Sequence, residues 1–421
     1  MIRRYLYPGL KKHLSAKEIT FLVGPRQAGK TTLLRQLQTE LENSGQATLF
    51  LNLDLEADLD QLSSQLELLQ IIRLRLGPAG GYVFIDEIQR KENAGIFLKG
   101  IYDQNLPYKF IVSGSGSFEL KEKIHESLMG RKRVFTLYPL SFPEFVDFQT
   151  EYHYSDRLPD YFSLQTDRLR QYLIEYLTFG GYPRVVLSPT TEAKQSALAE
   201  ILQSYLEKDI RYLLNIDKNR TFSDLLRLLA VQTGSPVNFS ELSATLTASQ
   251  LTVKKYLWYL EKTFIVQEVT PYFRNRRSEI TKSPLYYFVD LGLRNYLFGL
   301  FPASITPFTA GHLFENFVLN HLQLQLPYYP FGFHFWRTTD GAEVDFVLER
   351  GPIPLPIEVK YQDLKKPVVP RSLKSFIRKY RPPMAYIVNL SLDLEIQIDT
   401  TKVVFLPYFH LDRLSDVRID P

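Results

Sequence analysis

An octapeptide near the amino end constrains this chain more than any other feature. Residues 24–31 read GPRQAGKT and fit the pattern G-x-x-x-x-G-K-[ST] at every position. The apolar run 19–23 before it is typical of a buried strand, and residues 32–37 after it have helical spacing. In that context the pattern cradles phosphate, because loop amides and the N-terminus of the next helix face the anion. We therefore predict a nucleoside triphosphate site; a lysine-bearing structural turn is the alternative.

Two side chains of the octapeptide carry most of the predicted binding. Lys30 would reach the β- and γ-phosphates, and the Thr31 hydroxyl would hold Mg²⁺. The glycines let successive backbone amides curl around the phosphates. The residues predicted to bind ATP are Gly24, Pro25, Arg26, Gln27, Ala28, Gly29, Lys30, Thr31, Thr32, Asp86 and Ser113.

A second apolar run, residues 82–85, ends in the acids Asp86 and Glu87. Asp86 would complete the Mg²⁺ shell, and Glu87 would polarise the attacking water as a general base. The chain leaves the sheet at the carboxyl end of a strand, so both acids can face a nucleotide crevice there. A solvated turn is the alternative.

Two later segments offer further candidates for the nucleotide site. Residues 109–117 are typical of a strand that ends in small polar residues, where Ser113 or Ser115 would sense the γ-phosphate; a glycine–serine turn is equally compatible. In the basic run 130–134, Arg131 is the preferred candidate to stabilise charge that develops on the γ-phosphate. A solvated turn or a nucleic-acid phosphate contact is the alternative. The predicted catalytic residues are Glu87, Lys30 and Arg131.

Composition limits the class of protein. A chain of 421 residues is too long for one ordinary core, and 45% hydrophobic with 23% charged residues is typical of a globular protein. There is no cysteine, which excludes disulfides and thiolate chemistry. No apolar run is long enough to cross a bilayer, and the first residues lack the apolar core of a signal peptide. We expect a cytoplasmic location. The net charge of +4 permits nucleic-acid contact without requiring it.

Four runs together resemble one family: GPRQAGKTTL, FIDEIQ, GRKRVFTLYPLSFPEF and FGGYPRVV. The chain resembles, over essentially its whole length, prokaryotic AAA-type P-loop ATPases fused to a C-terminal domain of unknown function. The resemblance implies the usual nucleotide roles for Lys30, Thr31, Asp86 and Glu87, with ATP and Mg²⁺ as cofactors. The run 113–117, SGSGS, departs from the Gly-Ser-Ser more common in relatives, so the γ-phosphate sensor stays open.

We expect an α/β architecture in four parts. Residues 1–160 would form the AAA-type core with a parallel sheet, and 161–216 a helical lid or connector. Residues 217–285 would form a winged helix, and 286–421 a small α/β domain like a restriction endonuclease.

The predicted winged helix has helices at 223–232, 238–246 and 250–262, followed by a strand at 264–266. In a helix-turn-helix the third helix would enter a major groove of DNA. Its exposed candidates are Thr252, Lys254, Lys255 and Trp258. The cluster Arg274–Arg277 falls where a wing would neutralise phosphates. A purely structural role is an equal alternative.

The last segment holds a second group of polar residues. Glu315 lies in an apolar helical run, Glu343 and Asp345 share one face of an alternating strand, and Glu358 and Lys360 share a face of the next. This order resembles the restriction-endonuclease-like core. The resemblance implies that Asp345 and Glu358 ligate Mg²⁺, that Lys360 positions water, and that Glu315 adds an acid. A solvated edge strand, or a fold kept for docking without cleavage, remains open.

The function predicted from the sequence is a Mg²⁺-dependent ATPase. It would couple ATP binding and hydrolysis to a conformational change on a nucleic-acid or protein partner, with DNA contacts through the winged helix and the nuclease-like domain. Two alternatives are a metal-dependent nuclease gated by ATP and a non-hydrolysing docking protein switched by nucleotide. A site that takes an arginine from a neighbour would imply a ring, so an oligomer is left open, as are the pathway and the partner.

Overall fold

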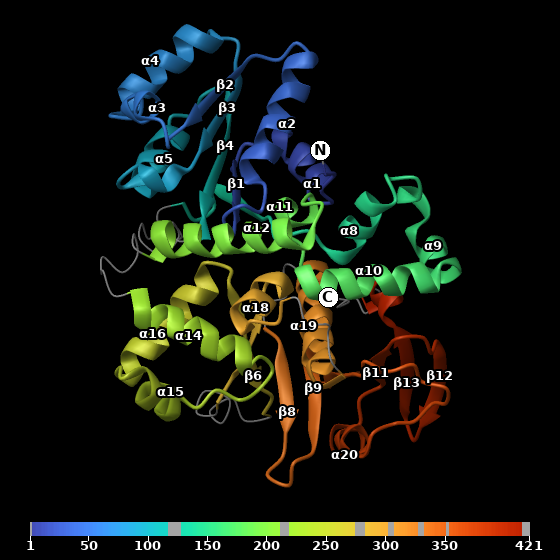
Figure 1. The fold of residues 1–421 in the computed structure, drawn as a ribbon. Coiled ribbons are helices and arrows are strands. Elements are labelled where there is room, and N and C mark those ends of the chain that lie inside the picture. The colour runs from blue at the N-terminus through green and yellow to red at the C-terminus, as the bar shows by residue number, and fades with distance from the viewer. Residues whose placement is uncertain are drawn as a thin grey trace.

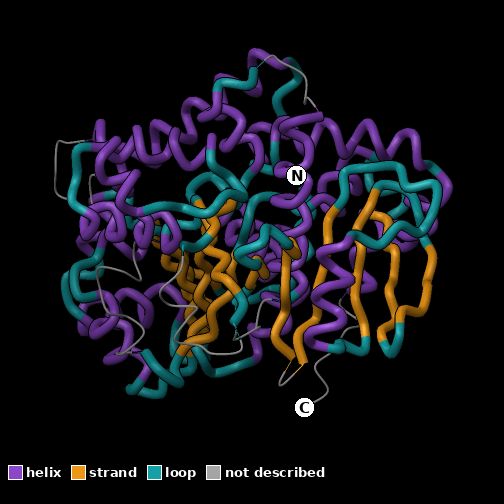
Figure 2. Tube along the Cα trace, turned by 90° about the horizontal axis from the view of Figure 1, so that it is seen from below, coloured by secondary structure: helices purple, strands orange, loops and turns teal. Residues whose placement is uncertain are grey.

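An N-terminal α/β domain and a larger C-terminal half lie on either side of a layer of long helices (Figure 1). The computed structural model describes residues 2–116, 128–210, 219–273, 283–301, 307–326, 332–350 and 353–414. Strands gather in two separate groups, each flanked by helices (Figure 2). The α/β class expected from the sequence is confirmed. None of the helices that the structure describes has the length and apolarity needed to span a bilayer.

The N-terminal domain is built on a five-stranded parallel sheet. Its strands are β1 (Ile19–Gly24), β2 (Thr48–Asn52), β3 (Gly81–Asp86), β4 (Tyr108–Ser115) and β5 (Lys132–Thr136). They lie in the order β2-β3-β4-β1-β5 and pair in parallel throughout. The central strands β1 and β4 are buried along their whole length, which explains their near-continuous apolar sequence. All carboxyl ends therefore meet at one edge.

Helices cover both faces of this sheet. One face packs against α1 (Tyr7–Lys12) and α2 (Lys30–Asn43), and the other against α4 (Gln65–Leu76) and α5 (Ala94–Tyr102), with the short α3 (Glu56–Asp60) beside β2. The buried side of α2 is the leucine stripe that predicted a helix after the octapeptide: Leu33, Leu34, Leu37 and Leu41.

The connecting layer is helical and begins before the segment 161–216 that was predicted from the sequence to form a lid or connector. It contains α8 (Phe142–Gln149), α9 (Leu158–Leu164), α10 (Thr166–Phe179), α11 (Pro183–Val186) and α12 (Thr191–Ser204), which continues as a π-helical turn, Tyr205–Ile210. A capping box fixes the start of α8, because Ser141 and Glu144 bond each other's backbone N–H. The buried side chains of α8 to α10 share one core with the C-terminal domain.

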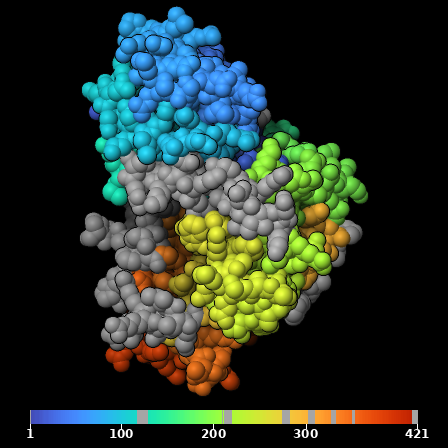
Figure 3. All heavy atoms as spheres, turned by 90° about the vertical axis from the view of Figure 1, so that its left-hand side faces the viewer, coloured from blue at the N-terminus to red at the C-terminus, as the bar shows by residue number. Residues whose placement is uncertain are grey.

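A three-helix unit follows, with two antiparallel strands after it. The elements are α14 (Asn219–Val231), α15 (Phe239–Leu246), α16 (Gln250–Lys262), β6 (Val266–Pro271) and β7 (Leu285–Phe288). The unit lies on the face seen in Figure 3, below the N-terminal domain. On α16, Lys254, Lys255 and Trp258 are exposed and Thr252 is half-buried. The predicted wing cluster Arg274–Arg277 lies outside the described residues.

The C-terminal domain continues the same sheet. Its strands are β8 (His334–Arg337), β9 (Glu343–Arg350), β10 (Ile353–Val359), β11 (Met384–Asn389), β12 (Leu394–Ile398) and β13 (Thr401–Pro407). The mixed sheet has the order β12-β13-β11-β10-β9-β8-β6-β7. Since β6 pairs with β8, the sheet is continuous across both units, and the expected boundary at 285/286 falls inside β7.

Helices pack on both faces of this larger sheet. They are α18 (Leu291–Phe298), α19 (Pro307–Gln325) and α20 (Arg371–Tyr380), with a final 3-10 segment, Tyr408–Leu414. The core that contains α19 is separate from the core under α20, so these two helices cover opposite faces. This sandwich of two helices around one sheet holds the acidic residues of β9 and β10.

Candidate functional site

The octapeptide forms a tight loop between β1 and α2, as predicted. Gly24 has φ of +149°, and a Cβ there would lie 2.1 Å from the Leu137 carbonyl oxygen, so no side chain fits. Gly29 has φ of +97° and immediately precedes α2, whose N-terminus no side chain caps. The loop therefore offers its own amides and the positive end of a helix at the carboxyl edge of the sheet.

Lys30 is buried inside this loop. Its ammonium donates to the carbonyl oxygens of Gly24 and Pro25, each at 2.9 Å, and the residue is only 5% exposed. A buried ammonium needs such partners, because desolvation of an unpaired charge is costly. The positive charge is thus held within the loop that would receive a phosphate.

Thr31 and the end of β3 are joined by hydrogen bonds. The Thr31 hydroxyl donates to Oδ2 of Asp86 at 2.7 Å, and the Ser113 hydroxyl donates to Oδ1 of the same carboxylate. The strand order explains this geometry. Because β4 lies between β1 and β3, the serines at its carboxyl end lie beside Asp86 of β3 on one side and the octapeptide after β1 on the other. Asp86 is 1% exposed and held from both sides. Hydroxyl and carboxylate oxygens are ligands that suit Mg²⁺.

Glu87 begins the turn after β3. Its φ of +56° is unusual for a non-glycine residue and turns the chain out of the sheet. The side-chain amide of Gln89 donates to the Glu87 carboxylate. Burial raises the pKa of Glu87, while the charges of Lys30 and Arg26 oppose that rise. Such a raised pKa is typical of a carboxylate placed to accept a proton.

Ser113 and Ser115 occupy different positions. Besides its bond to Asp86, the Ser113 hydroxyl accepts from the Glu87 backbone N–H at 3.4 Å. Ser115 pairs in register with Gly24, and its own N–H donates to the Gln89 side chain at 3.3 Å. Ser113 therefore orients the two acids, and Ser115 lies nearer the phosphate loop. Ser117 lies outside the described residues.

Arg131 is not brought to this site. Its carbonyl accepts from the N–H of Ile19, at the amino end of β1, and its guanidinium pairs with Asp103 at 2.7 Å. Ile19 and Gly24 stand at opposite ends of β1, about 17 Å apart at roughly 3.3 Å per residue. The prediction that Arg131 acts on the γ-phosphate fails within its own chain, because β5 runs parallel to β1 and places its first residues at the far edge.

The remaining residues of the octapeptide serve the shape of the loop. Arg26 and Gln27 are half-buried, and Gln27 has φ of +60°. Ala28 is buried, and its carbonyl accepts from Nη1 of Arg4 at 2.9 Å. Thr32 is exposed on the first turn of α2.

Arg4 also contacts the octapeptide, although no sequence motif singles it out. Its guanidinium also bonds Glu144 at 3.2 Å and the Tyr138 carbonyl at 2.6 Å. It thus ties the octapeptide to α8 and to the segment after β5. The partners lie up to 140 residues away along the chain, so no local pattern signals the contact.

The Gly-Gly-Tyr-Pro segment between α10 and α11 also lies beside the loop. A Cβ on Gly29 would meet the Pro183 ring at 3.9 Å. The N–H of Gly181 donates to Asp290, a buried carboxylate that also caps α18 by accepting from the Leu293 N–H at 2.9 Å. Burial raises the pKa of Asp290 to about 6. Asp290, which the sequence did not mark, therefore joins this segment to the C-terminal half.

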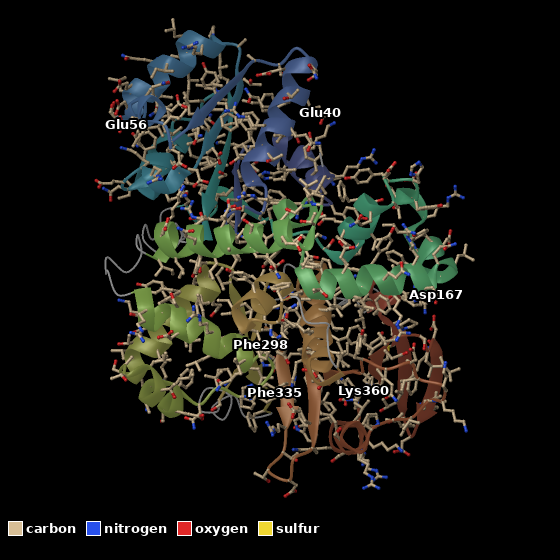
Figure 4. All side chains as sticks on the ribbon, viewed as in Figure 1. Glu40, Glu56, Asp167, Phe298, Phe335 and Lys360 are labelled. Carbon is tan, nitrogen blue, oxygen red and sulfur yellow. The ribbon has the colours of Figure 1, made fainter. Side chains whose placement is uncertain are left out.

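The second predicted group assembles in the C-terminal domain, where β9 begins and β10 ends. Oδ2 of Asp345 accepts from the Val359 N–H at 2.6 Å, and Oε1 of Glu358 pairs with Lys360 at 2.6 Å. Lys360 is labelled in Figure 4, beside β9. Glu358 is 3% exposed, and its Oε2 finds no hydrogen-bond partner among the described residues.

Glu315 reaches this group from α19. It bonds His312 at 3.1 Å and the Tyr287 hydroxyl at 3.4 Å. Burial raises the pKa of Asp345 well above its usual range, and the nearby Glu358 carboxylate adds to the rise. Burial also raises the pKa of Glu358, against the opposing charge of Lys360. The four predicted residues therefore lie close enough for their charges to interact: Glu315, Asp345, Glu358 and Lys360.

The same residues do not form a ready metal cage. Over the described ranges, no three His, Cys, Asp or Glu side chains converge closely enough to hold a metal ion. Mg²⁺ is often held by one or two carboxylates together with water and substrate phosphate, so Asp345 and Glu358 would supply such a pair. The orphaned Oε2 of Glu358 fits that role.

Three family models match the chain. Residues 16–146 match the AAA domain, 170–304 match a domain of unknown function (DUF8612), and 310–409 match another (DUF4143). The chain therefore carries an AAA-type P-loop ATPase domain fused to C-terminal domains of unknown function, which confirms the resemblance.

Three similar proteins match most of the chain along its length, and each carries the name of an uncharacterized protein. A protein of Mycobacterium tuberculosis is 28% identical over 377 residues, 89% of this chain and 76% of that protein. A protein of Haemophilus influenzae is 25% identical over 86% of this chain and 87% of that protein. A protein of Methanocaldococcus jannaschii is 24% identical over 80% of this chain and 73% of that protein.

Solved structures give weaker similarity. The Aeropyrum pernix ORC1 protein in complex with DNA is 15% identical, covers 70% of this chain and 92% of its own, and has a TM-score of 0.30. AMPPCP-bound DnaA from Aquifex aeolicus is 16% identical and has a TM-score of 0.28. The match covers 61% of this chain and 86% of DnaA. These scores are too low to carry an argument about function.

Proposed function

We propose that the N-terminal domain hydrolyses ATP in the presence of Mg²⁺. The observation that carries the proposal is the hydrogen-bonded chain from Thr31 through Asp86 to Ser113, with Glu87 beside it and Lys30 inside the loop. Thr31 and Asp86 would hold the metal, which when bound neutralises charge on the β- and γ-phosphates.

Each protein group has one task in this reaction. The loop amides and the Lys30 ammonium bind the phosphates and stabilise the charge that develops during transfer. The Glu87 carboxylate, whose pKa burial raises, accepts a proton from the attacking water. Gln89 and Ser113 hold Glu87 in place through its side chain and its backbone.

We further propose that the nucleotide state is transmitted to the C-terminal half. Two contacts support this. The Pro183 ring lies 3.9 Å from where a Cβ on Gly29 would stand, and Gly181, two residues earlier, is bonded to Asp290 at the N-cap of α18. At the end of β4, a Cβ on Gly116 would lie 2.2 Å from the Lys262 carbonyl, which is the last residue of α16. A shift of the octapeptide would therefore reach the segment 180–183, and a shift at the end of β4 would reach the end of α16.

Measurement of ATP turnover tests this proposal. We expect Mg²⁺-dependent release of phosphate that changes when double-stranded DNA, single-stranded DNA, RNA or a protein partner is added. Turnover that none of the nucleic acids alters would favour a protein partner. Retention of unhydrolysed ATP with negligible turnover under every condition would contradict hydrolysis and favour a nucleotide-switched docking protein.

A metal-dependent nuclease gated by ATP is the second candidate function. The buried Glu358 oxygen without a described partner, next to Asp345 and Lys360, favours it. Carboxylates placed this way would hold Mg²⁺ and present water to a phosphodiester.

Plasmid incubation with Mg²⁺ or Mn²⁺ tests the nuclease. If this domain cleaves DNA, Asp345→Ala should lower the cutting rate about 100-fold or more, because loss of a metal-bound carboxylate removes transition-state stabilisation. The control is Asp340→Ala, an exposed acid on the turn before β9, which should cut at the wild-type rate. Equal cutting by wild type and Asp345→Ala, or no cutting by either, would contradict this candidate.

A further inference from the structure

Exposed cations cover α20 and the segment before it. This surface, here called the basic face, consists of Lys365, Lys366, Arg371, Lys374, Arg378, Lys379 and Arg381, all exposed. Within the described ranges none of them forms an ion pair with a carboxylate, whereas other cations of the domain do. The sequence contains no Asp or Glu from residue 364 to residue 392.

This concentration of charge departs from the rest of the chain. Overall, 50 Lys and Arg residues are balanced by 46 Asp and Glu residues. Elsewhere in the same domain, Lys402 pairs with Glu395 at 2.6 Å and Arg413 pairs with Asp393 at 2.9 Å. A patch of one sign repels itself and attracts polyanions. The basic face is therefore a site of positive potential on a nearly neutral protein.

The helix presents these cations in a fixed orientation. Leu373, Phe376 and Ile377 are buried against the sheet, so α20 cannot rotate or detach without exposing core. Arg371 and Arg378 are two turns apart, with Lys374 between them, on the opposite side of the helix. They span about 10 Å along α20, a length over which one DNA strand carries about three phosphates.

We propose that the basic face binds the phosphate backbone of double-stranded DNA. A convex helix can follow the edge of the wide major groove of B-form DNA, whereas the major groove of A-form RNA is too narrow for it. Single strands usually bind in grooves with exposed aromatic rings, and the basic face has no exposed aromatic residue. Membrane insertion would need a free apolar side, and that side of α20 is buried.

The basic face is joined to the acidic group of the same domain. The apolar side of α20 packs against β9 and β10, the strands that carry Asp345 and Glu358. Clustered carboxylates repel phosphate, so a duplex that approaches this domain needs cations to hold it. Figure 1 shows α20 at the end of the molecule far from α4, and Figure 4 shows nitrogen-tipped side chains at that end. This inference deepens the proposed function by naming the partner.

Salt-dependent DNA binding tests the inference. The variant is Arg371→Gln with Lys374→Gln and Arg378→Gln, and the probe is a fluorescent duplex of about 30 base pairs, without ATP, between about 50 and 200 mM salt. We expect binding to weaken at least about tenfold at the lower salt. We also expect the slope of log K against log salt to become shallower by up to about 2.7, or about 0.9 for each lost phosphate contact.

A matched control removes the same charge elsewhere. Arg73, Arg75 and Lys99 are exposed on α4 and α5 of the N-terminal domain, and their replacement by Gln should leave the slope unchanged. Equal weakening by both triple variants would show a general charge effect and overturn the proposal. A basic-face variant that binds DNA as tightly as wild type would also overturn it. So would a variant that keeps DNA binding but no longer binds anionic phosphatidylserine vesicles, because the basic face would then bind a lipid surface. Since ATP is absent, failed hydrolysis would leave this test intact.

Discussion

Lys30→Ala is expected to lower the rate of ATP turnover about 100-fold or more. Removal of one donor that stabilises developing charge in a reacting site has an effect of this size. The wild-type ammonium is held inside the octapeptide by the Gly24 and Pro25 carbonyls, within the loop that would receive the phosphate. Alanine leaves the loop amides but removes the charge that faces the β- and γ-phosphates. Phosphate release and fluorescent-nucleotide binding should both fall.

The control for this prediction is Lys12→Ala, an exposed lysine on α1 of the same domain. It should hydrolyse ATP at the wild-type rate. Thermal unfolding of both variants checks that the fold survives, since Lys30 is buried and its two carbonyl partners lose a donor. A folded Lys30→Ala protein with wild-type turnover would refute the assignment of the nucleotide site.

Local sequence patterns were enough to predict the strand, loop and helix at the start of the N-terminal domain. The strand at β1, the octapeptide and the leucine stripe of α2 are encoded within 25 consecutive residues, from Ile19 to Asn43. The helix predicted at 250–262 matches α16, because the Ser249 cap and the apolar spacing are both local signals. Where hydrogen bonds stay within a few residues, the sequence specifies the element directly.

Contacts between distant segments could not be predicted in this way. The position of Arg131 depends on the direction of β5 relative to β1. Because the two strands run parallel, Arg131 lies beside the amino end of β1, at the edge of the sheet opposite the octapeptide. Asp290 and Gly181 are 109 residues apart, and their bond exists only because α18 docks under α10. The strand pairing of β6 with β8, which merges two expected domains into one sheet, is equally non-local.

Glu87→Gln is expected to bind ATP and fail to turn it over. Glutamine has nearly the shape of glutamate and can still accept the Gln89 hydrogen bond through its amide oxygen, so the turn after β3 should persist. It cannot accept a proton from water at neutral pH. General-base catalysis contributes about 10²–10⁴ to a rate, and turnover should fall by that range while nucleotide affinity stays the same or increases.

The pH dependence identifies Glu87 as the base more sharply than the rate alone. Burial raises the pKa of this carboxyl, so wild-type turnover should fall as the pH decreases through that raised value and the base becomes protonated. The residual turnover of Glu87→Gln should lack that decrease, because glutamine does not titrate. Glu92→Gln, an exposed neighbour, should keep both the rate and the pH profile of wild type. If Glu87→Gln instead retained the acid decrease at full rate, another group would have to activate the water, and the geometry around Asp86 would serve binding alone.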